Sequence, residues 1–203
     1  MFIILAEIFL LGLIGGAVPG PILTAVFTEI IRVGFRKSLK IISYALLAEV
    51  VIASIVISGV HSLNLPESYF HILSFFGALV LFWLAYKVWK IGGIDSTSTP
   101  LFSLPKIFLL TVLNGGFWIF WTTICIPRAF NLAEMVSGGQ FLFLLLFEFG
   151  WLSSTVLLAY IFSYFRPILQ KKSLVSSVFK VFAILLVLFA LKSIFEGIVY
   201  FFM

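Results

Sequence analysis

Charged residues are scarce in this chain of 203 residues. Only 10% of the residues are Asp, Glu, Lys or Arg, and 63% are hydrophobic. In a soluble globular domain, by comparison, about a quarter of the residues carry charge. This composition excludes water as the main solvent of the folded chain and predicts an integral membrane protein.

Cysteine and histidine are also rare. The single cysteine, Cys125, lies inside an apolar run, so the chain can form neither an intramolecular disulfide nor a CxxC redox pair. The two histidines, His61 and His71, flank one predicted loop, away from Ser153 and Ser154, and form no convergent cluster of metal ligands. These absences argue against redox relay chemistry and against an intramembrane enzyme, and we expect no cofactor and no metal.

The apolar residues are grouped in runs of about 20 residues or more. At a rise of about 1.5 Å per residue, a helix formed by each run can cross a hydrocarbon core about 30 Å thick. The first run carries Glu7 and has no basic segment before it, which is more typical of a first span than of a signal peptide. With the turn-forming residues between them, the runs predict six transmembrane helices, at residues 2–31, 39–60, 69–89, 105–127, 139–164 and 177–202.

Basic residues occur mainly in alternate connections between these predicted helices. Eleven of the 13 lie in or beside the first, third and fifth connections: Arg32, Arg36, Lys37, Lys40, Lys87, Lys90, Lys106, Arg166, Lys171, Lys172 and Lys180. The positive-inside rule places these connections in the cytoplasm. We therefore expect a multi-pass protein of the plasma (inner) membrane with both termini outside. Since membrane orientation explains the net charge of +5, we expect no nucleic-acid partner.

Three predicted helices precede a polar segment at residues 92–104, and three come after it. Because an odd number of spans in the first half inverts the orientation of the second half, two related halves would form a 3+3 inverted-topology repeat, which is common among secondary transporters. We therefore predict a single transmembrane domain at 1–203, with a first half at 1–91, a cytoplasmic linker at 92–104 and a second half at 105–203.

The first predicted helix contains a segment that interrupts helical structure. Pro19 and Pro21 lack a backbone N–H, and Gly15 and Gly20 lie beside them. A helix that restarts here would direct the positive end of its dipole towards an anion such as a carboxylate. These four residues are therefore candidate substrate-binding residues, with a proline kink used only for packing as the alternative.

The fourth predicted helix has a comparable weak point. Asn114, Gly115 and Gly116 are consecutive inside an apolar run, and Asn114 adds a side-chain amide. We predict a second helix break here and count these three residues among the candidate substrate-binding residues. The alternative is a glycine contact that lets two membrane helices approach closely.

Two glutamates lie near the centres of predicted helices. Glu49 is in the second helix and Glu148 is in the fifth, which an inverted repeat would pair with the second. The spacing from break to glutamate is also similar, at 29 residues from Gly20 to Glu49 and 33 residues from Gly115 to Glu148. Trp151 shares a helix face with Glu148 and is a further candidate substrate-binding residue.

The chemistry of these glutamates predicts a role in proton coupling. A charged carboxylate at mid-membrane costs about 2.5–3.5 kcal/mol even on a lenient insertion scale. We therefore expect Glu49 and Glu148 to face the interior of the bundle. Burial disfavours the charged form of a carboxyl group, so such groups can exchange protons near neutral pH. A neutral, hydrogen-bonded glutamic acid with no transport role is the alternative.

Two further charged pairs lie near helix ends. Lys192 and Glu196 are four residues apart in the last predicted helix, a spacing that favours mutual neutralisation. Glu29 and Arg32 fit an interfacial pair at the cytoplasmic end of the first helix. The sequence assigns neither pair a mechanism.

Several short motifs occur in a fixed order along most of the chain. They are Gly15-x-x-x-Pro19-Gly20-Pro21, Gly34-Phe-Arg-Lys37, Ala45-Leu-Leu-Ala-Glu49, Leu110-Thr-Val-Leu-Asn114, Phe117-Trp-Ile-Phe-Trp121 and Glu148-Phe-Gly-Trp151. This order resembles the LysE/RhtB family of amino-acid exporters. The chain departs from that family in places. The family usually has aspartate at the place of Glu49 and Asn-Pro-Lys at the place of Asn114-Gly115-Gly116, and small residues replace several of its glycines in the second predicted helix.

The resemblance implies an all-α integral membrane protein that works as a secondary transporter. The expected function is export of an amino acid or a similar small metabolite from the cytoplasm, with proton antiport as the expected mechanism. The expected partners are the small-molecule substrate and the lipid bilayer, and a homodimer is plausible. A metal-cation exporter of a related family and a non-transporting scaffold subunit are the alternatives.

Overall fold

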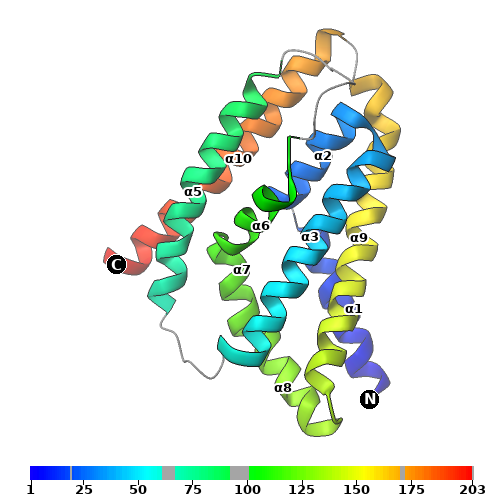
Figure 1. The fold of residues 1–203 in the computed structure, drawn as a ribbon, viewed down its shortest axis with the longest axis vertical. Coiled ribbons are helices and arrows are strands. Elements are labelled where there is room, and N and C mark those ends of the chain that lie inside the picture. Colours follow the sequence, from blue (N-terminus) through cyan, green and yellow to red (C-terminus); the bar gives the residue numbers. More distant parts are fainter. Residues whose placement is uncertain (19, 61–66, 92–100, 170–171, 203) are drawn as a thin grey trace.

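The computed structural model shows a bundle of helices (Figure 1). It describes residues 1–18, 20–60, 67–91, 101–169 and 172–202, and these contain no strand. Several sequence predictions fall outside the described residues, namely those on Pro19, His61, Lys171 and most of the linker at 92–104. The helical content and the apolar spans confirm the predicted all-α membrane class.

The helices are arranged along the chain in the order expected from the apolar runs. In the first part of the chain they are α1 (Phe2–Ala17), α2 (Pro21–Val33), α3 (Phe35–Ile55), the π-helical turn η1 (Val56–Val60) and α5 (Glu67–Trp89). In the second part they are α6 (Leu104–Val112), α7 (Gly115–Phe120), the π-helical turn η2 (Trp121–Cys125), α8 (Ile126–Met135), α9 (Gly139–Leu169) and α10 (Lys172–Phe202).

Three unbroken segments are long and apolar enough to cross a membrane. They are Phe35–Gly59, Gly139–Ile168 and Ser176–Phe202. Two bent pairs also qualify, α1 with α2 at 60° and α6 with Gly116–Met135 at 61°. The first and fourth predicted helices are therefore broken, as the sequence indicated. The described apolar part of α5, Phe75–Trp89, is shorter than a span, so the sixth span and the exact repeat stay predictions.

Some helix boundaries differ from the predicted ones. The second predicted helix begins at Phe35 instead of residue 39, and only Gly34 separates α2 from α3. Gly34 has a φ of 88°, a conformation that glycine adopts without steric cost, so one residue suffices for the turn. Arg36 and Lys37 are good helix formers and continue α3 into the basic connection.

Close helix packing defines the bundle. α1 lies along α9, α5 lies along α10, and α3 contacts α2, α6 and α9 (Figure 1). At the contact of α1 with α9, a Cβ added to Gly12 or Gly16 would collide with backbone carbonyl oxygens of α9, and one added to Gly150 would collide with a carbonyl of α1. These glycines therefore permit the close backbone approach that membrane helices use in place of hydrophobic burial.

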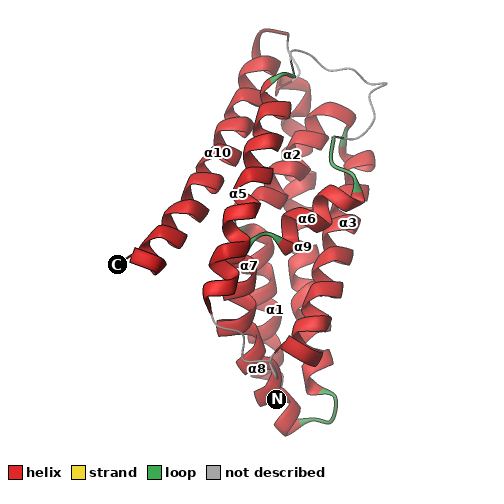
Figure 2. Cartoon of the chain, turned by 60° about the vertical axis from the view of Figure 1, so that its left-hand side comes forward, coloured by secondary structure: helices red, strands yellow, loops and turns green. Residues whose placement is uncertain are grey.

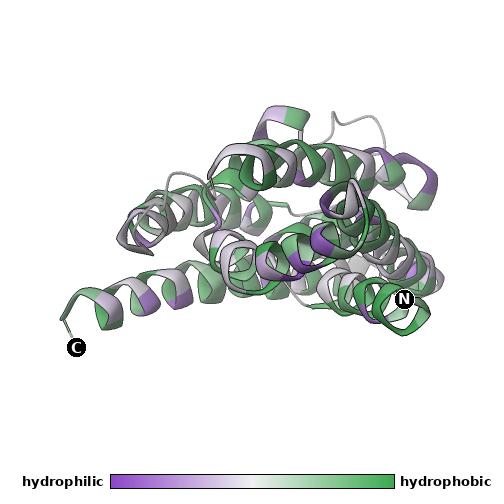
Figure 3. Cartoon of the chain, turned by 90° about the horizontal axis from the view of Figure 1, so that it is seen from below, coloured by the Kyte–Doolittle hydropathy of each residue, from purple (hydrophilic) through white to green (hydrophobic). Residues whose placement is uncertain are grey.

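The outer surface of the bundle is apolar. Large side chains are exposed on outward faces, among them Leu79, Leu145, Leu157 and Phe195. The ribbon viewed along the bundle is coloured mostly as hydrophobic, outer helices included (Figure 3). The C-terminal end of α10 lies at the outer edge of the bundle (Figure 2), where Tyr200 still stacks on His71 of α5. Such a surface suits contact with lipid.

Basic residues gather at one end of the molecule. The ends of α2, α5 and α9 and the beginnings of α3 and α10 all lie at the upper end of Figure 1. These helix ends carry Arg32, Arg36, Lys37, Lys87 and Arg166. The arrangement agrees with the positive-inside pattern of the sequence, and the membrane orientation that this pattern implies stays a prediction.

Candidate functional site

The first helix break places the start of α2 in the interior. Gly20 is extended, and α2 begins with Pro21, which has no N–H to satisfy. The amides of Ile22 and Leu23 belong to the first turn, where no preceding helical carbonyl can accept from them. Among the described residues, no side chain caps this end. The break therefore leaves the positive end of a helix dipole directed inwards.

The second helix break lies between α6 and α7. α6 ends at Val112, Asn114 is in an extended conformation, and α7 begins at Gly115. The indole nitrogen of Trp118 donates a hydrogen bond of 2.6 Å to the carbonyl oxygen of Val112. Trp118 thus satisfies a carbonyl that has lost its helical partner, and this stabilises the break.

A cavity of about 370 Å³ lies between the two breaks, and we call it the central cavity. Every α-helix except α8 contributes to its wall. The predicted site residues on its lining are Gly15, Gly20, Pro21, Glu49, Asn114, Gly116 and Trp151. The volume lies within the range of about 300–1,000 Å³ that is usual for ligand pockets. Gly115 adjoins this lining as the first residue of α7.

Glu49 provides a carboxyl group in the wall of the central cavity. It projects from α3 one helical turn after Ala45, which also lines the cavity. The indole of Trp121 in η2 is close enough to interact with the Glu49 carboxyl, although its nitrogen forms no regular hydrogen bond within the described structure. The motif Phe117-Trp-Ile-Phe-Trp121 gave no indication of this proximity, because nothing local in the sequence relates Trp121 to Glu49.

Lys192 and Glu196 reach the same cavity from α10. Their charged groups are 3.5 Å apart, and their side chains are 69% and 44% exposed. The ion pair expected from their spacing is therefore present. The structure adds that the pair lines the central cavity together with Ser193, a position that the sequence did not indicate.

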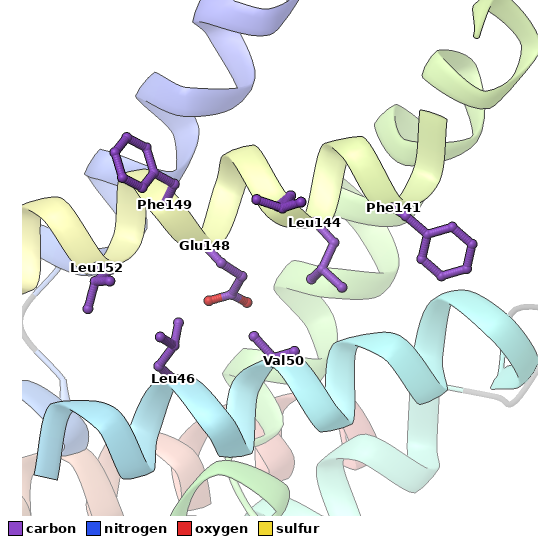
Figure 4. A pocket seen from close by; sticks show the side chains of 8 residues that line it. Leu46, Val50, Phe141, Leu144, Glu148, Phe149 and Leu152 are labelled. Atoms are coloured by element: carbon purple, nitrogen blue, oxygen red, sulfur yellow. The ribbon is translucent and has the colours of Figure 1, made fainter. Parts of the chain in front are cut away.

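Glu148 is buried, in keeping with the expectation that it faces the interior of the bundle, but it lies outside the lining of the central cavity. It lines an apolar groove between α3 and α9, while Phe147, Trp151 and Thr155 of α9 line the central cavity. Figure 4 shows the Glu148 carboxyl directed at α3. Glu148 and Trp151 lie three residues apart on α9 and are both buried, but they line different spaces. The two glutamate carboxyls still interact electrostatically across this contact.

The sequence did not predict the hydrogen-bond partners of Glu29 outside its own helix. It is fully buried, and its Oε1 accepts hydrogen bonds from Arg32 at 3.0 Å and from the backbone amides of Leu101 and Phe102 at 2.5 and 3.3 Å. Lys106 donates to the carbonyl oxygen of Leu101. The Glu29–Arg32 pair is therefore not merely interfacial, because it ties α2 to the segment before α6.

Other polar residues contribute to packing. His71 is buried in α5 and stacks on Tyr200 of α10, with ring centroids 4.3 Å apart. Thr155 donates a hydrogen bond of 3.4 Å to the carbonyl oxygen of Gly16, which joins α9 to the end of α1. Within the described ranges, no three His, Cys, Asp or Glu side chains are grouped as metal ligands.

Comparison with known proteins identifies one family. Residues 13–197 match the family model described as LysE type translocator. No curated protein and no solved structure matches the chain. The matched range includes every residue that lines the central cavity.

Proposed function

The chain belongs to the LysE type translocator family, and from this premise we propose that it exports an amino acid or a similar small zwitterion from the cytoplasm by proton antiport. Membership of the family makes it a multi-pass membrane transporter for a small molecule. The observation that carries the finer proposal is the central cavity, where a helix N-terminus and a carboxyl group face the same space.

The start of α2 suits the carboxylate of a zwitterion. The amides of its first turn and the positive end of its dipole lie where Gly20 and Pro21 form part of the wall of the central cavity. Glycine at this position allows a ligand to approach the backbone closely, and an added Cβ at Gly20 would lie 3.8 Å from its nearest neighbour. The carboxylate would therefore bind to backbone groups, which make little distinction between amino-acid side chains.

Glu49 suits the ammonium group of the same substrate. Its carboxyl lines the cavity, and charge-assisted hydrogen bonds from ammonium to carboxylate are about twice as strong as neutral ones. Asn114 at the second break supplies a further polar group on this wall. Lys192 and Glu196 offer an exchangeable ion pair, since an incoming carboxylate or ammonium can replace either partner.

The two carboxyl groups explain how substrate and proton could be coupled. Glu49 and Glu148 interact electrostatically, so the charged form of one disfavours the charged form of the other. Binding of an ammonium group at Glu49 favours its charged form and releases a proton. When the substrate leaves, a proton returns. Export of the zwitterion would then accompany proton movement in the opposite direction.

Alternating access would come from movement of the helices around the two breaks. In transporters with inverted repeats, two halves rock against each other about a site near the middle of the membrane. Here the breaks are bent by 60° and 61°, and both border the cavity. The predicted halves at 1–91 and 105–203 are the moving parts in this proposal, and both termini lie outside the cell.

The test is efflux of labelled amino acids from proteoliposomes, with and without an imposed proton gradient. We expect gradient-stimulated efflux of at least one amino acid by the wild-type protein and its loss in Glu49→Gln. Glu7→Gln is the matched control, because Glu7 is an exposed carboxyl on α1 that does not line the cavity.

Three outcomes separate the alternatives. Efflux that persists in Glu49→Gln would refute the role of this carboxyl and leave export intact. Efflux at the same rate with and without the proton gradient would refute proton antiport. If folded protein moves no amino acid of the panel, the substrate class is wrong, and uptake assays with metal cations would then test the rival transport function.

A further inference from the structure

The groove between α3 and α9 is a second ligand-sized space. Its volume is about 430 Å³, and we call it the outer groove. α3 contributes Leu46 and Val50, and α9 contributes Leu144, Leu145 and Phe149 among others (Figure 4). Leu145 and Phe149 are exposed on the outside of the bundle. The groove therefore opens towards the lipid-facing surface.

Glu148 is the only polar residue among the described residues that line the outer groove. The residue is only 5% exposed. Neither of its carboxyl oxygens has a hydrogen-bond partner within the described structure, and the carboxyl is directed across the groove at α3 (Figure 4). A buried polar group without a partner is unfavourable, so this site is suited to bind a group that supplies donors.

The outer groove is separate from the central cavity. On α3, Ala45 and Glu49 line the cavity while Leu46 and Val50 line the groove, and α9 divides its faces in the same way. The contact of α3 with α9 thus forms the partition between them. A ligand in the groove would reach Glu148 from the side of the lipid without passing through the site proposed for the zwitterion.

We propose that the outer groove binds an amphiphilic amine, with its ammonium group on Glu148 and its apolar part against the leucine, valine and phenylalanine side chains. An ammonium group has three N–H donors and a positive charge, which match two carboxyl oxygens that lack donors. An anion would be repelled by a charged Glu148. A hard metal ion would need several oxygen ligands, whereas the other lining residues are apolar.

The experiment is direct binding of tritium-labelled 4-phenylbutylamine to the purified protein in lipid nanodiscs. We expect saturable binding that unlabelled 4-phenylbutylamine displaces and that the neutral analogue 4-phenylbutanol displaces at least about tenfold less well, because the alcohol lacks the charge. Glu148→Gln should weaken binding by at least about tenfold. The readout is binding, so it does not depend on whether the chain exports amino acids.

Two further variants exclude a folding artefact. Val50→Trp keeps Glu148 and fills the groove from α3, so it should also abolish binding. Glu7→Gln removes an exposed carboxyl outside the groove and should bind like the wild type. The fold of each variant is checked by size-exclusion chromatography and thermal unfolding.

Two results would overturn the proposal. Binding that is unchanged in both Glu148→Gln and Val50→Trp would show that the amine does not bind in the outer groove. Binding that is lost in Glu49→Gln but kept in Glu148→Gln would place the amine in the central cavity. Loss of binding in Glu148→Gln and Val50→Trp, with binding kept in Glu49→Gln and Glu7→Gln, supports binding in the outer groove.

Discussion

Replacement of the buried Glu29 should destabilise the fold more than loss of any exposed carboxylate. In Glu29→Ala, Arg32 loses a partner at 3.0 Å, and the amides of Leu101 and Phe102 lose their acceptor. Removal of one partner from a buried ion pair costs about 3–5 kcal/mol. The two amides belong to the same network and their costs do not add fully. We therefore expect the free energy of unfolding to fall by about 3–5 kcal/mol.

Glu29→Gln separates charge from hydrogen bonding. The amide oxygen of glutamine can still accept, but without the charge that strengthens bonds from Arg32 and from the backbone. We expect a smaller loss, of about 1–2 kcal/mol. The assay is equilibrium unfolding of the purified protein in mixed micelles with increasing SDS, monitored by tryptophan fluorescence.

Glu7→Ala is the matched control for this series. Glu7 is exposed on α1, and surface substitutions of this kind usually change stability by less than about 0.5 kcal/mol. If Glu29→Ala and Glu7→Ala lower the free energy of unfolding equally, the Glu29 network does not stabilise the connection between α2 and the segment before α6.

Two further substitutions test the helix packing and the second helix break. Gly12→Ala should lower the free energy of unfolding by about 1–3 kcal/mol, since the new Cβ would collide with the carbonyl oxygen of Phe147. Gly59→Ala is its control, because a Cβ there meets nothing within 4 Å. Trp118→Phe removes the hydrogen bond to Val112 and should cost about 0.5–1.5 kcal/mol in the same unfolding assay. It should also slow efflux, because the carbonyl at the break loses its donor.

These two predictions fail in different ways. Equal stability of Gly12→Ala and Gly59→Ala would mean that α1 and α9 can separate at no cost. Trp118→Phe with wild-type stability and efflux would show that the indole hydrogen bond has no part in maintaining the break.

Span lengths and helix breaks could be predicted because their causes are local. An apolar run of sufficient length forms a helix in lipid, since its backbone groups have no other partners there. Pro21 cannot donate a backbone hydrogen bond, so the helix restarts at this residue, and the second break falls at Asn114, directly before Gly115 and Gly116. The structure accordingly has bent pairs at both places. The cost of a mid-membrane carboxylate likewise singled out Glu49 and Glu148 without reference to their neighbours.

The tertiary structure alone decided which space each charged group faces. Membrane helices are apolar on all sides, so their sequence carries little periodicity to mark the inward face. The sequence therefore could not tell that Glu148 lines a groove apart from Glu49, or that Lys192 lines the central cavity. Glu29 and Leu101 are 72 residues apart, and their contact exists only because the helices between them return the chain to α2.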